Sequence, residues 1–260
     1  MSKFRIPRSV FLIDVGTVFW RDWIVLKRRL TKFILSRMAA PILYLVAFGY
    51  GLGRSISVES ETYIDFLVPG ILALNSMNIS FNSITPVHAE RVYHKSLEEY
   101  ILAPISSTAF VIGKILAAIL RSVISSVLIL VLAFIFGASL QALTVPSTAF
   151  TFLTVLVLNS AIFAGLGFIA AMTIKTYEEM AQVNTYILLP MSFLCGTFFK
   201  TTTLPDGIRF FIELLPLTHT SYLLRGLGTG TEVSLLSLVI LIVYMAVILT
   251  AGIKIMRNVE

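Results

Sequence analysis

The sequence is poor in charged residues and in cysteine. Asp, Glu, Lys and Arg make up 13% of its 260 residues, whereas a soluble domain carries about 25%. Hydrophobic residues make up 57% of the chain, which is more than a soluble core of this length needs, and the mean hydropathy is +0.91. The single cysteine, Cys195, excludes a disulfide or a cysteine-based zinc site within the chain. These values indicate a polytopic integral membrane protein.

Patterns of catalysis and nucleotide binding are also missing. The pair Gly113–Lys114 lacks both the earlier glycine and the following Ser or Thr of a phosphate-binding P-loop. His88, His94 and His219 do not have the spacing of a metal site. The apolar stretches contain no dense series of Asp, Glu and His, which argues against a proton-coupled pump. We therefore expect no catalytic residue, no metal site and no cofactor in this chain.

Six apolar stretches are long enough to cross a bilayer as helices, which takes about 20 residues. The sequence thus predicts an all-α integral membrane fold with a single domain, 1–260. Residues 1–32 are expected to form an interfacial segment and residues 33–256 a bundle of six spans. The six stretches are Phe33–Leu52, Ile64–Val87, Thr108–Gly137, Pro146–Ile174, Met180–Phe199 and Val233–Met256.

The segment before the first span is expected to be an amphipathic helix in the membrane interface, with Trp20 and Trp23 at headgroup depth. The alternative is a solvent-facing helix packed on a soluble domain, although no such domain remains to receive it. Apolar residues at helical spacing form one stripe and charged residues fall opposite. The stripe is Leu12, Val15, Phe19, Trp23, Leu26 and Leu30, and the opposite face carries Asp14, Arg21 and Arg28.

The distribution of basic residues predicts the orientation of the spans. Nine of the 20 Lys and Arg residues lie between Lys3 and Arg37. With both termini in the cytoplasm, fifteen basic residues fall on the cytoplasmic side and four on the outer side, as the positive-inside rule requires. Because the basic residues cluster beside apolar runs, the net charge of +6 reflects topology and predicts no nucleic-acid partner.

The cytoplasmic connection Glu90–Pro104 is a candidate contact with a partner subunit. It is short, charged and helix-prone, and it joins two long spans, so a partner could move both spans through it. The alternative is a plain surface connector. A second connection on the same side, Lys175–Gln182, is more typical of an ordinary loop. The residues assigned to the contact are Glu90, Arg91, Val92, Lys95, Leu97, Glu98 and Ile101.

The outer region Phe198–Gly230 is too apolar for a free loop and too broken by prolines to span the membrane. Two short re-entrant helices would fit, since backbone at membrane depth must be covered by protein. The alternative is a structured cap without a role in transport. Arg209 and Glu213 have the i, i+4 spacing of a helical ion pair. The hairpin residues are Pro205, Arg209, Glu213, Pro216, His219 and Arg225.

Polar residues inside the expected spans are further candidates. Asn75, Asn78 and Asn82 share one helix face, and Arg121 lies within the third span. Such residues either line a pathway or join helices through hydrogen bonds. The two interpretations stay open for the asparagines, whereas a structural role is favoured for Arg121.

Taken in order, several segments resemble the permease subunit of type-2 ABC exporters, most closely the branch of nodulation-factor and antibiotic-resistance exporters. The likeness covers nearly the whole chain. The segments are Pro41–Gly53, Phe66–Ile71, Glu90–Arg91, Leu97–Glu98, Ala103–Ser106, Leu189–Phe199 and Leu215–His219.

The resemblance implies a homodimer in the inner membrane of a prokaryote, with two copies of a P-loop ATPase that hold ATP and Mg²⁺. It places the family's coupling helix on Glu90–Tyr100 and the outer hairpin on Lys200–Arg225. It also implies a pathway along the two-fold axis and an amphipathic substrate, such as a lipid-linked sugar, a lipid or a drug. The alternatives are a secondary transporter or channel without an ATPase, and an intramembrane enzyme or assembly factor.

Overall fold

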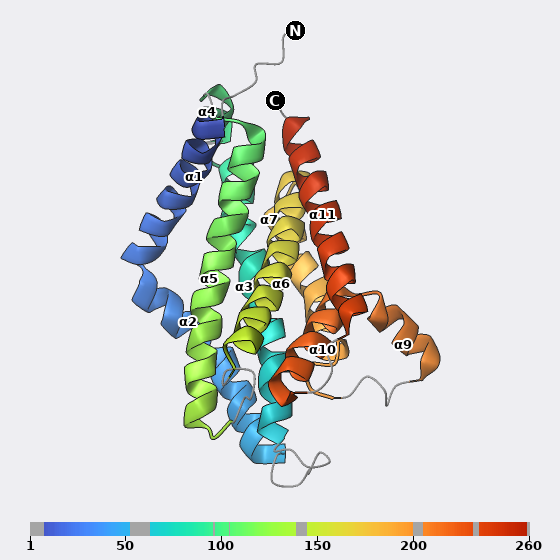
Figure 1. The fold of residues 1–260 in the computed structure, drawn as a ribbon. Coiled ribbons are helices and arrows are strands. Elements are labelled where there is room, and N and C mark those ends of the chain that lie inside the picture. The colour runs from blue at the N-terminus through green and yellow to red at the C-terminus, as the bar shows by residue number, and fades with distance from the viewer. Residues whose placement is uncertain are drawn as a thin grey trace.

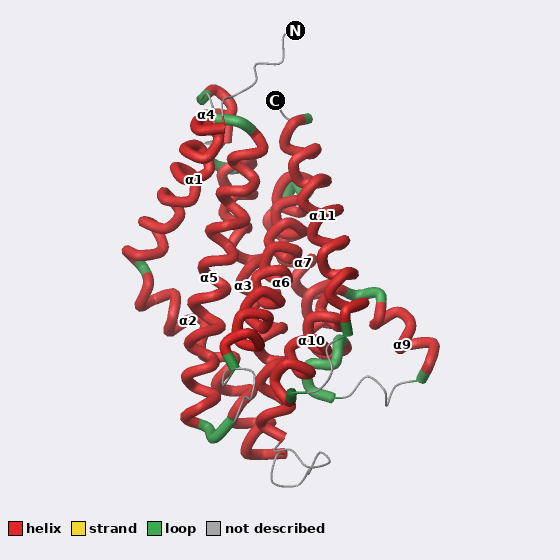
Figure 2. The backbone as a smooth tube through the Cα atoms, in the orientation of Figure 1, coloured by secondary structure: helices red, strands yellow, loops and turns green. Residues whose placement is uncertain are grey.

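The computed structural model describes residues 8–52, 63–95, 97–103, 105–138, 145–199, 205–230 and 234–258, and in these ranges the regular structure is entirely helical (Figures 1 and 2). The predicted all-α fold is confirmed. The elements in chain order are α1 (Arg8–Arg28), α2 (Leu30–Tyr44), the π-helical η1 (Leu45–Leu52), α3 (Tyr63–Val92), α4 (Leu97–Leu102), α5 (Ser107–Ile135), α6 (Pro146–Thr173), α7 (Tyr177–Val183), the π-helical η3 (Asn184–Leu188), α8 (Leu189–Leu194), α9 (Asp206–Glu213), α10 (Pro216–Thr229) and α11 (Leu235–Arg257).

Helix α3 is the centre of the bundle. It packs against α5, α6 and α10, and most of its side chains are buried. Polar groups in this core bond to one another: Asn159 on α6 donates to Ser76 Oγ at 2.6 Å and accepts from Thr220 Oγ1 on α10 at 2.9 Å. An apolar membrane gives α3, α6 and α10 no water to satisfy such groups, so these bonds fix the helices to one another.

Five helices are long and apolar enough to cross a membrane. They correspond within a few residues to five of the six predicted stretches, because the length of an uninterrupted apolar run sets the length of such a helix. The first begins at Leu30, a few residues before the predicted start at Phe33. The five are Leu30–Gly49, Tyr63–Val92, Ser107–Ile135, Pro146–Thr173 and Leu235–Arg257.

The sixth predicted stretch, Met180–Phe199, is not one regular helix. Its residues 180–194 lie in α7, η3 and α8, which follow one another without a gap, and its residues 195–199 form turns and a bend. The π-helical segment η3 interrupts the α-helical hydrogen bonds, and Pro190 at the start of α8 has no N–H to donate. The described helices therefore confirm five spans of the predicted six.

The two ends of the bundle differ. The first residues of α1, the short α4 and the last residues of α11 lie at one end, whereas η1 ends near the other (Figure 1). Between α8 and α11, the two short helices predicted for the outer region are present as α9 and α10, and α9 projects from the side of the bundle. Pro205 and Pro216 precede and begin these helices, and Gly230 ends α10 with a left-handed φ of 73°.

Helix α1 packs along α5, with Val15, Val18 and Leu26 buried. The predicted apolar stripe is only partly correct, because Leu12 is exposed and the charged Asp22 faces the bundle. Gly113 on α5 permits this contact: a Cβ there would lie 2.8 Å from Val18 Cβ. Trp20 is exposed and Trp23 is half-buried.

Candidate functional site

An ion-pair cluster joins three helices at the α4 end of the bundle. Lys114 Nζ on α5 lies 3.4 Å from Glu90 Oε2 on α3 and 3.3 Å from Asp22 Oδ1 on α1. Arg21 Nη2 on α1 donates to Glu90 Oε1 at 2.8 Å. The side chain of Lys114 is only 3% exposed. A buried ammonium held by two carboxylates fixes α1, α3 and α5 relative to one another.

Two residues assigned to partner contact point into the chain instead. Glu90 is buried in the ion-pair cluster. Arg91 donates to the backbone carbonyls of Met172 and Ile174, at the end of α6. Because the last carbonyls of a helix have no intrahelical donor, Arg91 completes the C-terminus of α6. In the described chain both charges bond to neighbouring helices, and contact of these residues with a partner stays a prediction.

Leu97 also differs from the expectation, because it is only 2% exposed and belongs to the hydrophobic core. Tyr100, on the same short helix, has its ring centroid 5.1 Å from the Arg21 guanidinium carbon and 5.0 Å from the ring of Phe110. These contacts hold α4 against the ion-pair cluster.

The remaining members of the assigned contact lie nearer the surface. Lys95 and Glu98 are exposed and Val92 is half-buried, whereas the side chain of Ile101 lies outside the described part of the chain. Two exposed apolar side chains that the sequence did not single out, Tyr93 and Leu102, stand beside them, and Leu102 is 87% exposed. A partner would thus meet Tyr93, His94, Lys95, Glu98, Glu99 and Leu102.

The three asparagines of α3 have different roles. Asn75 donates to Ser125 Oγ on α5 at 3.0 Å and so joins two helices. Asn78 and Asn82 donate to carbonyl oxygens of their own helix, those of Leu74 and Asn78. All three nevertheless line cavities between α2 and α3. The packing interpretation therefore holds for Asn75, and the other two place amide groups beside open space.

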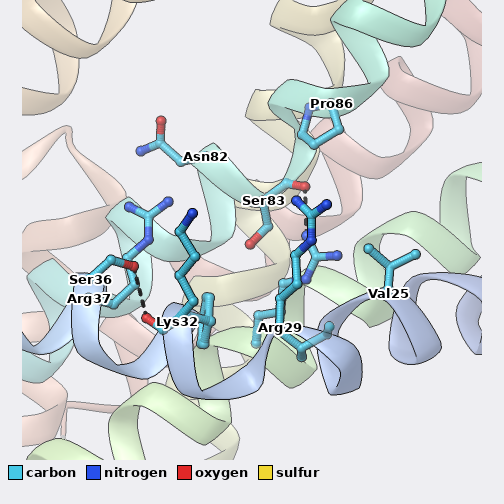
Figure 3. A pocket seen from close by; sticks show the side chains of 11 residues that line it. Val25, Arg29, Lys32, Ser36, Arg37, Asn82, Ser83 and Pro86 are labelled. Atoms are coloured by element: carbon cyan, nitrogen blue, oxygen red, sulfur yellow. Dashed lines mark hydrogen bonds between the residues drawn. The ribbon is translucent and has the colours of Figure 1, made fainter.

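Two adjoining cavities of about 330 and 280 Å³ lie beside α2. The larger is shown in Figure 3 and lies where α1 meets α2. Arg121 lines it from α5 and donates to the carbonyl of Ser83 at 3.2 Å, which agrees with the structural role favoured for this residue. Both cavities share Ser36, Arg37 and Asn82. Both are lined by polar and apolar side chains together.

The outer hairpin is held by its own polar side chains. Arg209 Nε donates to Glu213 Oε1 at 2.6 Å, as the i, i+4 spacing predicted, and this hydrogen bond raises the pKa of Arg209. His219 contacts the Glu213 carbonyl at 2.9 Å and Ser237 Oγ at 3.2 Å, which ties α9, α10 and α11 together.

Arg225 on α10 fixes the hairpin to the centre of the bundle. It donates to the carbonyls of Thr197 and Phe66, and its guanidinium lies 3.8 Å from the centroid of the Phe66 ring. Gly70 leaves the space for this contact, since a Cβ there would lie 2.4 Å from Thr197 O and 2.9 Å from Arg225 Nη2.

Sequence reasoning missed the partners of these groups. Arg21 was assigned only to the charged face of the amphipathic helix, and Asp22 and Asn159 were not singled out. A carboxylate beside an apolar stripe is a signal of a buried ion pair. The pattern does not identify the cation that pairs with Asp22, because Lys114 lies far from Asp22 along the chain.

An all-helical bundle with long apolar helices, a braced charged helix at one end and polar cavities beside a span defines a multi-pass membrane transport protein. The chain belongs to the ABC-2 type transporter family, whose model matches residues 14–227. It is the membrane-spanning permease subunit of an ABC exporter, and this family works with an ATPase subunit.

Named relatives agree with this membership. Nodulation protein J of Bradyrhizobium diazoefficiens is 28% identical over 250 residues, which cover 93% of this chain and 92% of the relative. Nodulation protein J of Rhizobium meliloti is 27% identical over 220 residues, covering 82% and 80%. Inner membrane transport permease YadH of Escherichia coli strain K12 is 24% identical over 220 residues, covering 80% and 83%.

Proposed function

We propose that this permease forms a homodimer that moves an amphipathic substrate, such as a lipid-linked sugar, a lipid or a drug, out of the cytoplasm. Two copies of a P-loop ATPase bind beneath it and hold ATP and Mg²⁺, since this chain has no P-loop sequence. The observation that carries the proposal is the bracing of α4, because a short helix fixed to three others can transmit force to all of them.

The coupling surface is the exposed side of α4 and of the turn before it. Leu102 and Tyr93 supply apolar anchors, and Lys95, Glu98 and Glu99 supply charges around them. On closure of the ATPase dimer, the push on α4 passes through Tyr100 and Arg21 to Glu90 and Lys114. We assign Leu97 and Glu90 to force transmission inside the chain and not to direct contact with the ATPase.

We further propose six spans in the inner membrane of a prokaryote, with both termini and α4 in the cytoplasm. This orientation is supported by the basic residues, of which fifteen fall in segments that it places in the cytoplasm. The sixth span is the continuous helical segment α7–η3–α8, which presents exposed apolar side chains such as Tyr186, Ile187 and Phe193. Helices α9 and α10 form a re-entrant hairpin on the outer side.

The test is co-purification of this chain with a co-expressed candidate P-loop ATPase subunit. The isolated permease is expected to show no ATP hydrolysis, and the complex is expected to hydrolyse ATP and to move substrate into inverted membrane vesicles. Transport by the permease alone, driven by an ion gradient, would instead identify a secondary transporter or channel.

A further inference from the structure

Four cationic side chains line one cavity. The 330 Å³ cavity has Arg29 and Lys32 at the α1–α2 junction, Arg37 on the next turns of α2, and Arg121 on α5. In Figure 3 the side chains of Lys32 and Arg37 extend from α2 across the cavity toward α3. The described lining contains neither Asp nor Glu. So many cations on one small cavity give it a positive potential.

The charges of Arg29, Lys32 and Arg37 are not paired within the described chain, whereas Arg121 is close enough to Asp22 for their charges to attract. No described carboxylate lies within ion-pair distance of Arg29, Lys32 or Arg37. The nearby acidic groups Asp22 and Glu90 are held by Lys114 and Arg21. Like charges that face one another without a counter-charge repel, and the repulsion grows as water is excluded. An anion in the cavity would remove this repulsion.

Apolar side chains share the lining of this cavity with the cations. They are Val25, Leu26, Phe33 and Pro86. The first membrane-spanning helix begins at Leu30, so the cavity borders its opening turns, where lipid headgroups meet the acyl chains. A cavity lined by both cations and hydrocarbon fits an anionic amphiphile better than it fits a free anion.

The adjoining 280 Å³ cavity extends this space along α2 and α3. It shares Ser36, Arg37 and Asn82 with the first cavity and adds the amides of Asn75 and Asn78. The two added amides, of Asn75 and Asn78, are polar but uncharged. A headgroup held by the cations would therefore have neutral hydrogen-bonding groups next to it along the span.

We propose that the cationic cavity binds the phosphate-bearing headgroup of an anionic amphiphile and is the cytoplasmic entry site of the exported substrate. The proposal rests on the proposed export function and narrows its substrate class to anionic amphiphiles. Arginine is suited to this role because its planar guanidinium donates two parallel hydrogen bonds to phosphate oxygens. Arg29, at the N-cap of α2, and Arg37, within α2, provide two such groups on the cavity lining.

The test is calorimetric titration of the full-length chain in phosphatidylcholine nanodiscs, with empty nanodiscs as background. The probes are dioctanoyl phosphatidic acid, dioctanoyl phosphatidylcholine and inorganic phosphate. The paired variant Arg29→Gln with Lys32→Gln removes two charges from the cavity. Its control, Lys27→Gln with Arg28→Gln, removes two exposed charges from the adjacent turn, outside the lining.

Dioctanoyl phosphatidic acid is expected to bind saturably, and the cavity pair is expected to weaken binding by about tenfold or more, as for hydrogen bonds to a charged group. The control pair is expected to change affinity by less than about twofold, as for exposed charges. If the paired variant folds poorly, Arg37→Gln alone provides a second test of the cavity by the same titration. Equal losses in cavity and control pairs, equal binding of phosphatidylcholine, or equal binding of inorganic phosphate would each overturn the proposal.

Failure of the entry site and failure of export are separable. A complex with its ATPase that assembles and hydrolyses ATP, yet binds no phosphatidic acid, overturns the entry site and leaves the proposed function standing. Saturable binding by a permease that never associates with an ATPase supports the anion site, overturns its export role and overturns the proposed function.

Discussion

Lys114 on α5 and Glu90 on α3 form a buried ion pair, with 3.4 Å between Lys114 Nζ and Glu90 Oε2. Asp22 on α1 is the second carboxylate on the same ammonium, at 3.3 Å. The pair lies directly beneath α4, which reaches it through the ring of Tyr100 on Arg21. The contact between the six-residue helix α4 and this pair therefore runs through Arg21 on α1.

Replacement of this lysine is expected to destabilise the protein. In Lys114→Met, the carboxylates of Asp22 and Glu90 lose their shared cation while they stay largely buried, which costs about 3 kcal/mol of unfolding free energy. Denaturant titration in detergent micelles measures the loss. The control is Arg209→Met, which breaks an exposed pair with Glu213 and is expected to cost much less, because an exposed ion pair contributes little to stability. Equal losses in the two variants would show that the cluster contributes no more than a surface pair.

A methyl group at Gly70 is expected to loosen the outer hairpin. The added Cβ of Gly70→Ala would meet the Thr197 carbonyl at 2.4 Å and the Arg225 side chain at 2.9 Å, so helix α3 or the hairpin must shift. Overpacking of this kind costs about 1–3 kcal/mol. Gly16→Ala is the matched control, because nothing lies within 4 Å of its Cβ, and it is expected to be neutral or slightly stabilising. Thermal unfolding of both variants measures these effects. An unchanged midpoint for Gly70→Ala would contradict the close approach of Thr197 and Arg225 to Gly70.

Substitutions of the two leucines of α4 are expected to affect different properties, ATPase binding for Leu102 and stability for Leu97. Leu102→Asp changes an exposed side chain, so folding should be normal while co-purification of the ATPase falls. Leu97→Ala removes a buried side chain and should lower the unfolding free energy by about 2–5 kcal/mol. Size-exclusion chromatography, unfolding and pull-down separate the two effects. Normal export and normal ATPase binding by Leu102→Asp and Tyr93→Asp would leave α4 as a plain connector.

Cysteine labelling checks the proposed orientation. In a Cys195→Ser background, a cysteine at the exposed His94 should react with a membrane-impermeant maleimide only after cell lysis. A cysteine at Gly207 on α9 should react on intact cells, since nothing lies within 4 Å of the Cβ at this position. Labelling of the His94 position from outside would reverse the topology derived from the basic residues.

The sequence by itself determined the membrane class, the helical fold and five of the spans. Each of these follows from a local property: apolar run length sets where a span begins and ends, and prolines and glycines mark the ends of α9 and α10. The spacing of Arg209 and Glu213 likewise predicted their ion pair, because neighbours on one helix turn need no other segment.

Only the tertiary structure decided which polar groups face the protein, a cavity or the surface. Glu90 and Leu97 are buried because α1 and α5 pack over them, and the residues that surround them come from distant parts of the chain. The cationic cavity likewise arises from α2 lying beside α3 and α5, which collects Arg29, Arg37 and Arg121 around one space. A sequence shows that these charges exist, but their partners and their potential depend on distances that folding alone sets.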